Sequence, residues 1–116
     1  MKLKPILPTL KEKKRYLGFE IISDSSFSSD DVAKAVKEGT LSFIGTLGTG
    51  KAGLMFLADK YANNAGVVKA GHKYVDKVRT ALALIKTIDN KDVIIRTRIV
   101  SGTLKKAISK FHAMRG

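Results

Sequence analysis

The sequence predicts a mixed α+β domain built around one antiparallel sheet. Short stretches rich in β-branched and aromatic residues alternate apolar with polar positions, as half-buried strands do. Two longer stretches between them place apolar residues at helical spacing. The chain has 116 residues, of which 44% are hydrophobic, so it is long enough for one domain with a buried core.

Each element has its own local signal. The expected strands span residues 15–23, 54–61, 66–69 and 93–100, and the expected helices span residues 29 to about 47, 74–88 and 103 to about 114. In the first strand, Leu17, Phe19 and Ile21 alternate with smaller or polar residues and form one apolar face. Ser29 is a candidate N-cap of the first helix, which we expect to end in a flexible glycine-rich connector over residues 45–53.

The order of these elements favours one known topology. Strand–helix–strand–strand–helix–strand is the split β-α-β arrangement of ferredoxin-like and RNA-recognition domains, here with an extra C-terminal helix. In that topology the fourth strand lies at an edge beside the first, and two helices cover one face and leave the other open. We predict an extended basic N-terminal arm over residues 1–12, which contains both prolines, and a single ferredoxin-like RNA-binding domain over residues 13–116.

Charge narrows the class of partner. The chain has 22 Lys and Arg residues against 10 Asp and Glu, a net charge of +12. Residues 1–15 carry six basic side chains against Glu12 alone, and residues 91–116 carry seven against Asp92 alone, whereas the segment between is almost balanced. Such a surplus at both ends favours binding of a polyanionic partner over a basic surface that is merely solvated. Among such partners, nucleic acid is favoured over a membrane surface.

Composition also excludes several classes. There is no cysteine, which rules out a disulfide scaffold and a thiolate metal site and suits a cytoplasmic location. No apolar run reaches the roughly 18 residues of a membrane-spanning helix. His72 and His112 lie far apart without acidic neighbours, so we predict no metal site and no catalytic residue in this chain.

Residues 45–51 match the first seven positions of the phosphate-binding loop G-x-x-x-x-G-K-[ST]. Ala52 then stands where the motif needs a hydroxyl to reach magnesium. The segment also follows a helix and not a strand, which disfavours nucleotide hydrolysis.

The candidate RNA contacts come from the two basic ends. Arg96 and Arg98 lie two residues apart in the last strand, so both are expected on the open sheet face, away from its β-branched residues. Glu20 of the adjacent strand is expected on the same face and can pair well with only one of them, which leaves the other for phosphate. Small side chains at the start of the last helix add hydroxyl and amide donors for an anion. The predicted RNA-binding residues are Lys13, Lys14, Arg15, Arg96, Arg98, Ser101, Thr103, Lys105, Lys106 and Lys110.

A second candidate surface is apolar. One short helix face in a small core needs fewer large apolar side chains than the three supplied by Phe43, Ile44 and Leu47. They are candidates for contact with a second copy of the chain or with a partner subunit. Ordinary core packing is the alternative.

Three blocks of sequence carry a family resemblance. They are Lys13-Lys14-Arg15-Tyr16-Leu17 followed by Ile21-Ile22-Ser23, then Leu41-Ser42-Phe43-Ile44-Gly45-Thr46-Leu47-Gly48, then Val100-Ser101-Gly102-Thr103-Leu104-Lys105-Lys106. In this order and spacing the chain resembles the archaeal ribonuclease P protein component 2 family, related to the eukaryotic Pop-five subunits, over about residues 9–111.

The resemblance implies a ferredoxin-like fold and a part in the endonucleolytic removal of the 5′ leader from precursor tRNA. It implies that the ribonuclease P RNA holds the catalytic Mg²⁺ and that the protein binds no cofactor itself. It implies two kinds of partner, that RNA and the TIM-barrel ribonuclease P protein component 3, in a complex with two copies of each protein, and precursor tRNA is a further candidate. From the residues alone, the alternatives are a general structured-RNA-binding protein and a protein scaffold of another ribonucleoprotein.

Overall fold

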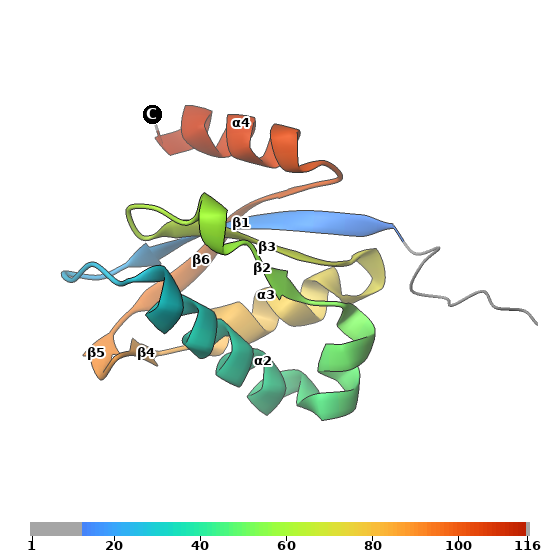
Figure 1. Ribbon diagram of the computed structural model, residues 1–116, viewed down its shortest axis with the longest axis horizontal. Helices are drawn as coiled ribbons and strands as arrows, with labels where there is room; N and C mark the ends of the chain where they lie inside the picture. Colours follow the sequence, from blue (N-terminus) through green and yellow to red (C-terminus); the bar gives the residue numbers. More distant parts are fainter. Residues whose placement is uncertain (1–12, 116) are drawn as a thin grey trace, which may run out of the picture.

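The computed structural model describes the backbone of residues 13–115 and the side chains of residues 13–45, 48 and 52–109. Four strands form one antiparallel sheet in the order β2-β3-β1-β6 (Figure 1). These strands are β1 (Lys14–Ile22), β2 (Met55–Phe56), β3 (Ala65–Gly71) and β6 (Ile94–Ser101). This is the predicted order, with β6 at the edge beside β1, and the architecture is ferredoxin-like.

Two helices cover one face of the sheet, α2 (Ser29–Ala52) and α3 (Val75–Leu84). The expectation that Leu17, Phe19 and Ile21 face these helices is confirmed, because all three belong to the buried core cluster. Val32 of α2 and Leu82 of α3 are fully buried in the same cluster. Each such side chain contributes about 1.5–3 kcal/mol by leaving water, so the core holds β1 in place.

The ends and the middle of α2 follow local chemistry. Ser28 is the N-cap, one residue before the predicted Ser29: its Oγ accepts a hydrogen bond from the Asp31 N–H at 3.2 Å. The helix kinks at Gly45, where φ is 90°, and ends before Gly53, where φ is 61°. The predicted connector over residues 45–53 is therefore wrong in part, because the chain resumes a helix after the kink. The partial phosphate-loop motif lies in that helix and in the kink before it.

Two predicted elements are shorter than expected. The strand predicted over residues 54–61 is only β2, followed by the 3₁₀ turn η1 (Ala58–Lys60). A second 3₁₀ turn, η2 (His72–Tyr74), leads into α3, and the helix predicted to residue 88 ends at Leu84. A small hairpin of β4 (Thr87–Ile88) and β5 (Lys91–Asp92) follows. Asp89 and Asn90 form its turn with φ of 52° and 61°, as a two-residue hairpin turn requires.

The sheet face that we expected to be open is partly covered. The C-terminal helix α4 (Leu104–Arg115) packs across β1 and β6 on the side opposite α2 and α3 (Figure 1). Ala107 of α4 and Val67 of β3 are buried, and neither belongs to the main core cluster. The apolar face of α4 must be buried, like those of the other helices, and it is buried against this face of the sheet.

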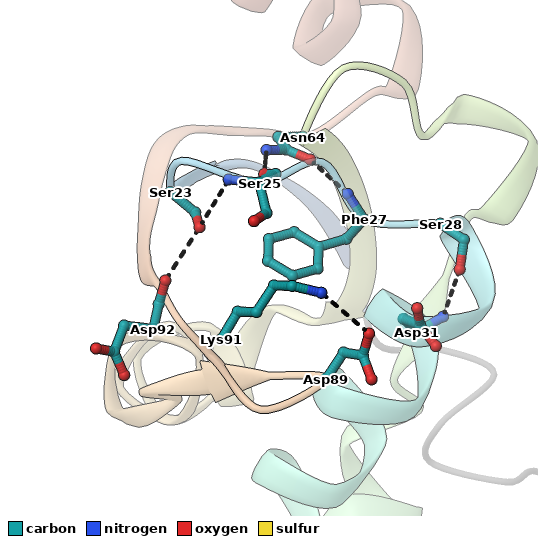
Figure 2. Close-up of polar contacts among 9 residues, drawn as sticks. All are labelled: Ser23, Ser25, Phe27, Ser28, Asp31, Asn64, Asp89, Lys91 and Asp92. Carbon is teal, nitrogen blue, oxygen red and sulfur yellow. Dashed lines mark hydrogen bonds and ion pairs between the residues drawn. The ribbon is translucent and has the colours of Figure 1, made fainter.

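The loop between β1 and α2 is held by Asn64 (Figure 2). Its Oδ1 accepts a hydrogen bond from the Phe27 N–H at 3.1 Å, and its Nδ2 donates to the Ser25 carbonyl at 2.7 Å. The Tyr61 hydroxyl lies 2.8 Å from the Phe27 carbonyl oxygen and 3.1 Å from Oδ1 of Asn64, and it can donate its one hydrogen to either. Burial raises the pKa of the Tyr61 phenol, so this group stays a neutral donor at neutral pH.

We predict that Asn64→Ala lowers the free energy of unfolding by about 2–3 kcal/mol, because it removes these side-chain hydrogen bonds and places Ala at a φ of 59°. The matched control is Asn90→Ala at a φ of 61° on an exposed turn, with an expected cost of about 1 kcal/mol. Urea unfolding measures both. Equal losses would contradict the assigned role of the Asn64 side chain.

Ala107→Asp tests the packing of α4. A carboxylate on the buried side of this helix is expected to cost about 1–3 kcal/mol in the free energy of unfolding. Ser109→Asp adds the same charge on the exposed side and should change stability by less than about 0.5 kcal/mol. If the two variants unfold at the same urea concentration, α4 does not pack on the sheet in solution.

Candidate RNA interface

The antiparallel pairing of β1 brings the two basic parts of the chain to one end of the sheet. Tyr16 near the start of β1 pairs with Lys69 near the end of β3 on one side and with Ser101 at the end of β6 on the other. A Cβ placed on Gly102 would lie 3.6 Å from Nη1 of Arg15. The segment that begins β1 and the segment that begins α4 therefore lie side by side.

Seven basic side chains among the described residues belong to this end, which we call the basic end. They are Lys13, Lys14, Arg15, Lys69, Lys73, Lys105 and Lys106. Five of them are predicted RNA contacts. Lys69 and Lys73 were missed, although the cross-strand pairing of a ferredoxin-like sheet places the end of the third strand beside the start of the first.

The side chains of the basic end point in several directions. Lys13, Lys73, Lys105 and Lys106 are exposed, and Lys14, Arg15 and Lys69 are half-buried. Nζ of Lys14 lies 3.2 Å from the position of a Cβ on Gly53, so this lysine reaches toward the end of α2. Arg15 instead lies beside the start of α4. The basic end thus extends from α2, around the sheet, to α4.

Hydrogen bonds at the start of α4 fix the position of its first turn. The Lys106 N–H donates to Oγ1 of Thr103 at 3.2 Å, and the Thr103 N–H donates to Oγ of Ser101 at 3.3 Å. Accepting these bonds holds the first turn, and with it Lys105 and Lys106, in place. It leaves the hydrogen of each hydroxyl available to an anion, so the expected anion contact of Ser101 and Thr103 stays a prediction.

Arg98 forms an ion pair with Glu20, with 2.7 Å between Nη1 and Oε1. Both side chains are mostly covered, with exposed fractions of 32% and 20%. The pairing of β1 with β6 contains a β-bulge, in which Arg98 is the extra residue between the pairs Phe19–Thr97 and Gly18–Ile99. The predicted strict alternation of side chains between the two sheet faces is therefore broken at Arg98. Arg98 is therefore neutralised, whereas Arg96 is exposed and has no ion-pair partner among the described residues.

The opposite end of the sheet is acidic. Asp24, Asp30, Asp31, Asp89 and Asp92 come from the loop after β1, the start of α2 and the β4–β5 hairpin. Figure 2 shows these segments together: Oγ of Ser23 donates to the Asp92 carbonyl at 3.0 Å, and Lys91 lies 3.5 Å from Oδ2 of Asp89. The two ends of the protein thus carry opposite excess charge, and a polyanion is attracted to one and repelled by the other.

The apolar candidate surface also differs from its prediction. Phe43 of α2 and Leu84 of α3 have exposed fractions of 46% and 52% and line a cleft of about 180 Å³ between the two helices. Ile44 instead packs against the core. The side chain of Leu47 lies outside the described residues, as do those of Lys110 and His112 and the whole predicted arm.

The Rpp14/Pop5 family model matches residues 15–112. The chain belongs to the Rpp14/Pop5 family. It is 41% identical over 116 residues to ribonuclease P protein component 2 of Pyrococcus abyssi, a match that covers 100% of this chain and 98% of that protein. The corresponding protein of Thermococcus gammatolerans is 40% identical over 112 residues, which cover 97% and 93% of the two chains. The resemblance inferred from the three sequence blocks is confirmed.

A solved structure shares the fold of this Rpp14/Pop5 chain. A chain in the cryo-EM structure of yeast ribonuclease MRP matches it with a TM-score of 0.54 and 15% identity, over 89% of this chain and 94% of that one. At this identity the likeness concerns the fold alone.

Two further observations concern the described part of the Rpp14/Pop5 chain. It contains no group of three or more His, Asp or Glu residues placed to hold a metal ion. No helix there is both long and apolar enough to cross a membrane.

Proposed function

We propose that this protein is a subunit of ribonuclease P that supports the catalytic RNA in removing the 5′ leader from precursor tRNA. The observation that carries the proposal is the basic end, where the β1 pairing gathers cations from three separate parts of the chain. The relatives at about 40% identity are ribonuclease P proteins, which identifies the enzyme.

The mechanism that we propose is electrostatic. A folded RNA catalyst brings phosphates close together, and their repulsion must be offset by Mg²⁺ or by other cations. Lys and Arg side chains stay protonated at neutral pH, so the basic end is suited to holding phosphates and not to abstracting protons. We therefore place bond cleavage and its Mg²⁺ in the RNA subunit, with the protein holding RNA helices in register.

Recognition of the RNA backbone fits this surface better than recognition of bases. An RNA-recognition domain stacks bases on exposed aromatic side chains of its central strands. Here Tyr16 is half-buried, Phe19 lies in the core, and Phe56 packs against Phe19 with ring centroids 6.3 Å apart. The lysines of the basic end require only phosphates.

The cleft between Phe43 and Leu84 supports a second part of the proposal, a contact with another protein subunit. Two exposed apolar side chains on neighbouring helices are typical of an interface anchor. We propose the TIM-barrel protein component 3 as its occupant, and self-association is the alternative. Precursor tRNA remains a second candidate for the basic end, and the cytoplasm is the expected location.

We predict that Lys105→Ala combined with Lys106→Ala raises the Mg²⁺ concentration needed for half-maximal cleavage by about twofold or more, because two fixed cations are lost from the RNA contact. The rate at saturating Mg²⁺ should stay close to that of the wild type. Cleavage of precursor tRNA is measured in an enzyme reconstituted from the RNA and all protein subunits.

The matched control is Lys34→Ala combined with Lys37→Ala, which removes the same charge from exposed positions of α2. Its Mg²⁺ requirement should equal that of the wild type. An equal rise in both variants would make net charge, and not the basic end, the cause. No rise in either would favour a scaffold role without a phosphate contact.

A further inference from the structure

A separate cleft of about 550 Å³ lies between α3 and the edge strand β6. It is lined by Asp76, Arg79, Thr80, Ala83, Ile95, Arg96 and Thr97. None of these residues belongs to the basic end. The cleft is therefore a distinct feature of the protein, with its own charged groups.

Two arginines carry the positive charge at this cleft: Arg79 comes from α3, whereas Arg96 pairs with Glu20 and so leaves the free edge of β6 on the face opposite α3. Arg79 and Arg96 are exposed, and neither forms an ion pair with any of the described residues. Asp76 is the only other charged residue in the lining, so the lining carries a net charge of +1. One phosphodiester, with a charge of −1, matches that balance.

The spacing of the α3 residues directs them to this cleft. Asp76, Arg79, Thr80 and Ala83 follow one another at intervals of three, one and three residues, so they share one face of the helix. Oγ1 of Thr80 donates to the Asp76 carbonyl at 2.9 Å, which leaves this hydroxyl oxygen able to accept but not to donate. On this wall the guanidinium of Arg79 is therefore the donor for an anion.

The edge strand supplies backbone donors on the other wall. Two hydrogen bonds show which way the β6 amides point. The Val93 N–H, two residues before Ile95, donates to the Lys86 carbonyl at 2.9 Å. Ile21, which pairs with Ile95, uses its N–H to bind the Asn64 carbonyl on the β3 side of β1. Backbone groups alternate sides along a strand, so the N–H groups of Ile95 and Thr97 point to the free edge of β6, away from β1. Amides at an unpaired edge can donate to a phosphate oxygen.

A buried oxygen lies at the same place. Oγ1 of Thr97 is the only buried side-chain oxygen or nitrogen without a hydrogen-bond partner in the described part of the chain. Rotation about the Cα–Cβ bond exchanges this hydroxyl with the methyl group and breaks no hydrogen bond. A phosphate oxygen in the cleft would give the hydroxyl a partner.

We propose that one phosphodiester of RNA binds at the outer rim of the cleft, at the free edge of β6, where it accepts from the edge amides of Ile95 and Thr97 and lies between the guanidinium groups of Arg79 on the α3 face and Arg96 on the opposite face. Guanidinium groups bind phosphate through paired N–H donors, which a lysine cannot reproduce. The inference rests on the proposed function for its ligand, RNA, and adds a second phosphate contact apart from the basic end. The phosphate comes from the ribonuclease P RNA or from precursor tRNA, and the experiment distinguishes these two sources.

The test is the double variant Arg79→Ala with Arg96→Ala in the full chain. Its affinity for labelled ribonuclease P RNA and for labelled precursor tRNA is measured separately at constant salt. We expect affinity for one of the two RNAs to fall about tenfold or more, since the contacts of two charged groups with the phosphate are lost. Arg79→Lys with Arg96→Lys keeps the charge and should still lose a substantial part of the affinity. Asp76→Asn should strengthen binding, because it removes the one negative charge of the lining.

Two parallel variants separate this inference from the proposed function. Lys34→Ala with Lys37→Ala removes equal charge elsewhere and should change affinity by less than about twofold. If Lys105→Ala with Lys106→Ala weakens binding and the arginine variant matches the Lys34 and Lys37 control on both RNAs, the cleft is not a phosphate site and the proposed function stands. If the arginine variant and the Lys105 and Lys106 variant both match that control, both proposals are wrong.

Discussion

The antiparallel pairing of β1 with β3 and β6 is the interaction on which the rest of the structure depends. It places the start of β1 beside the end of β3 and the end of β6, and so joins basic segments from distant parts of the chain. Phe19 and Leu17 hold β1 in this register because both are fully buried against α2 and α3. A slip of one residue would turn these side chains to the other face and would also move the cations.

Much of the fold was predictable because each strand and helix has a local signal. The alternation of Leu17, Phe19 and Ile21 and the order of the elements were enough to predict the sheet and its edge strand. The position of α4 was not predictable, since an amphipathic helix can cover either face of a sheet. The hairpin after α3 was missed because the buried side chains of Ile85 and Ile88 continue a helical spacing, although the chain there is extended.

The candidate site was predictable in composition but not in detail. Clusters of lysine and arginine are visible in the sequence, whereas the choice of Glu20 between two arginines depends on a β-bulge that no local pattern shows. Leu84 and Arg79 join their clefts only through the packing of α3 against α2 and β6. Side chains that become neighbours through tertiary packing leave no signal in the spacing of one segment.

In the proposed complex with RNA, the separation of charge orients this small protein on the larger molecule. Acidic groups around the β4–β5 hairpin repel phosphates, and the basic end attracts them, so approach in the reverse orientation is disfavoured before any contact forms. This orientation needs no base-specific contact. It depends on a rigid scaffold, which the two helical layers around the sheet provide.

The most direct test of this account is the salt dependence of binding to ribonuclease P RNA between about 100 and 500 mM monovalent salt. For about six phosphate contacts, a plot of the logarithm of affinity against the logarithm of salt concentration should have a slope of roughly −4.2 to −5.4. Loss of Lys105 and Lys106 together should reduce the magnitude of that slope by about 1.4–1.8. An affinity that does not change with salt would contradict the claim that the basic end binds the RNA through its phosphates.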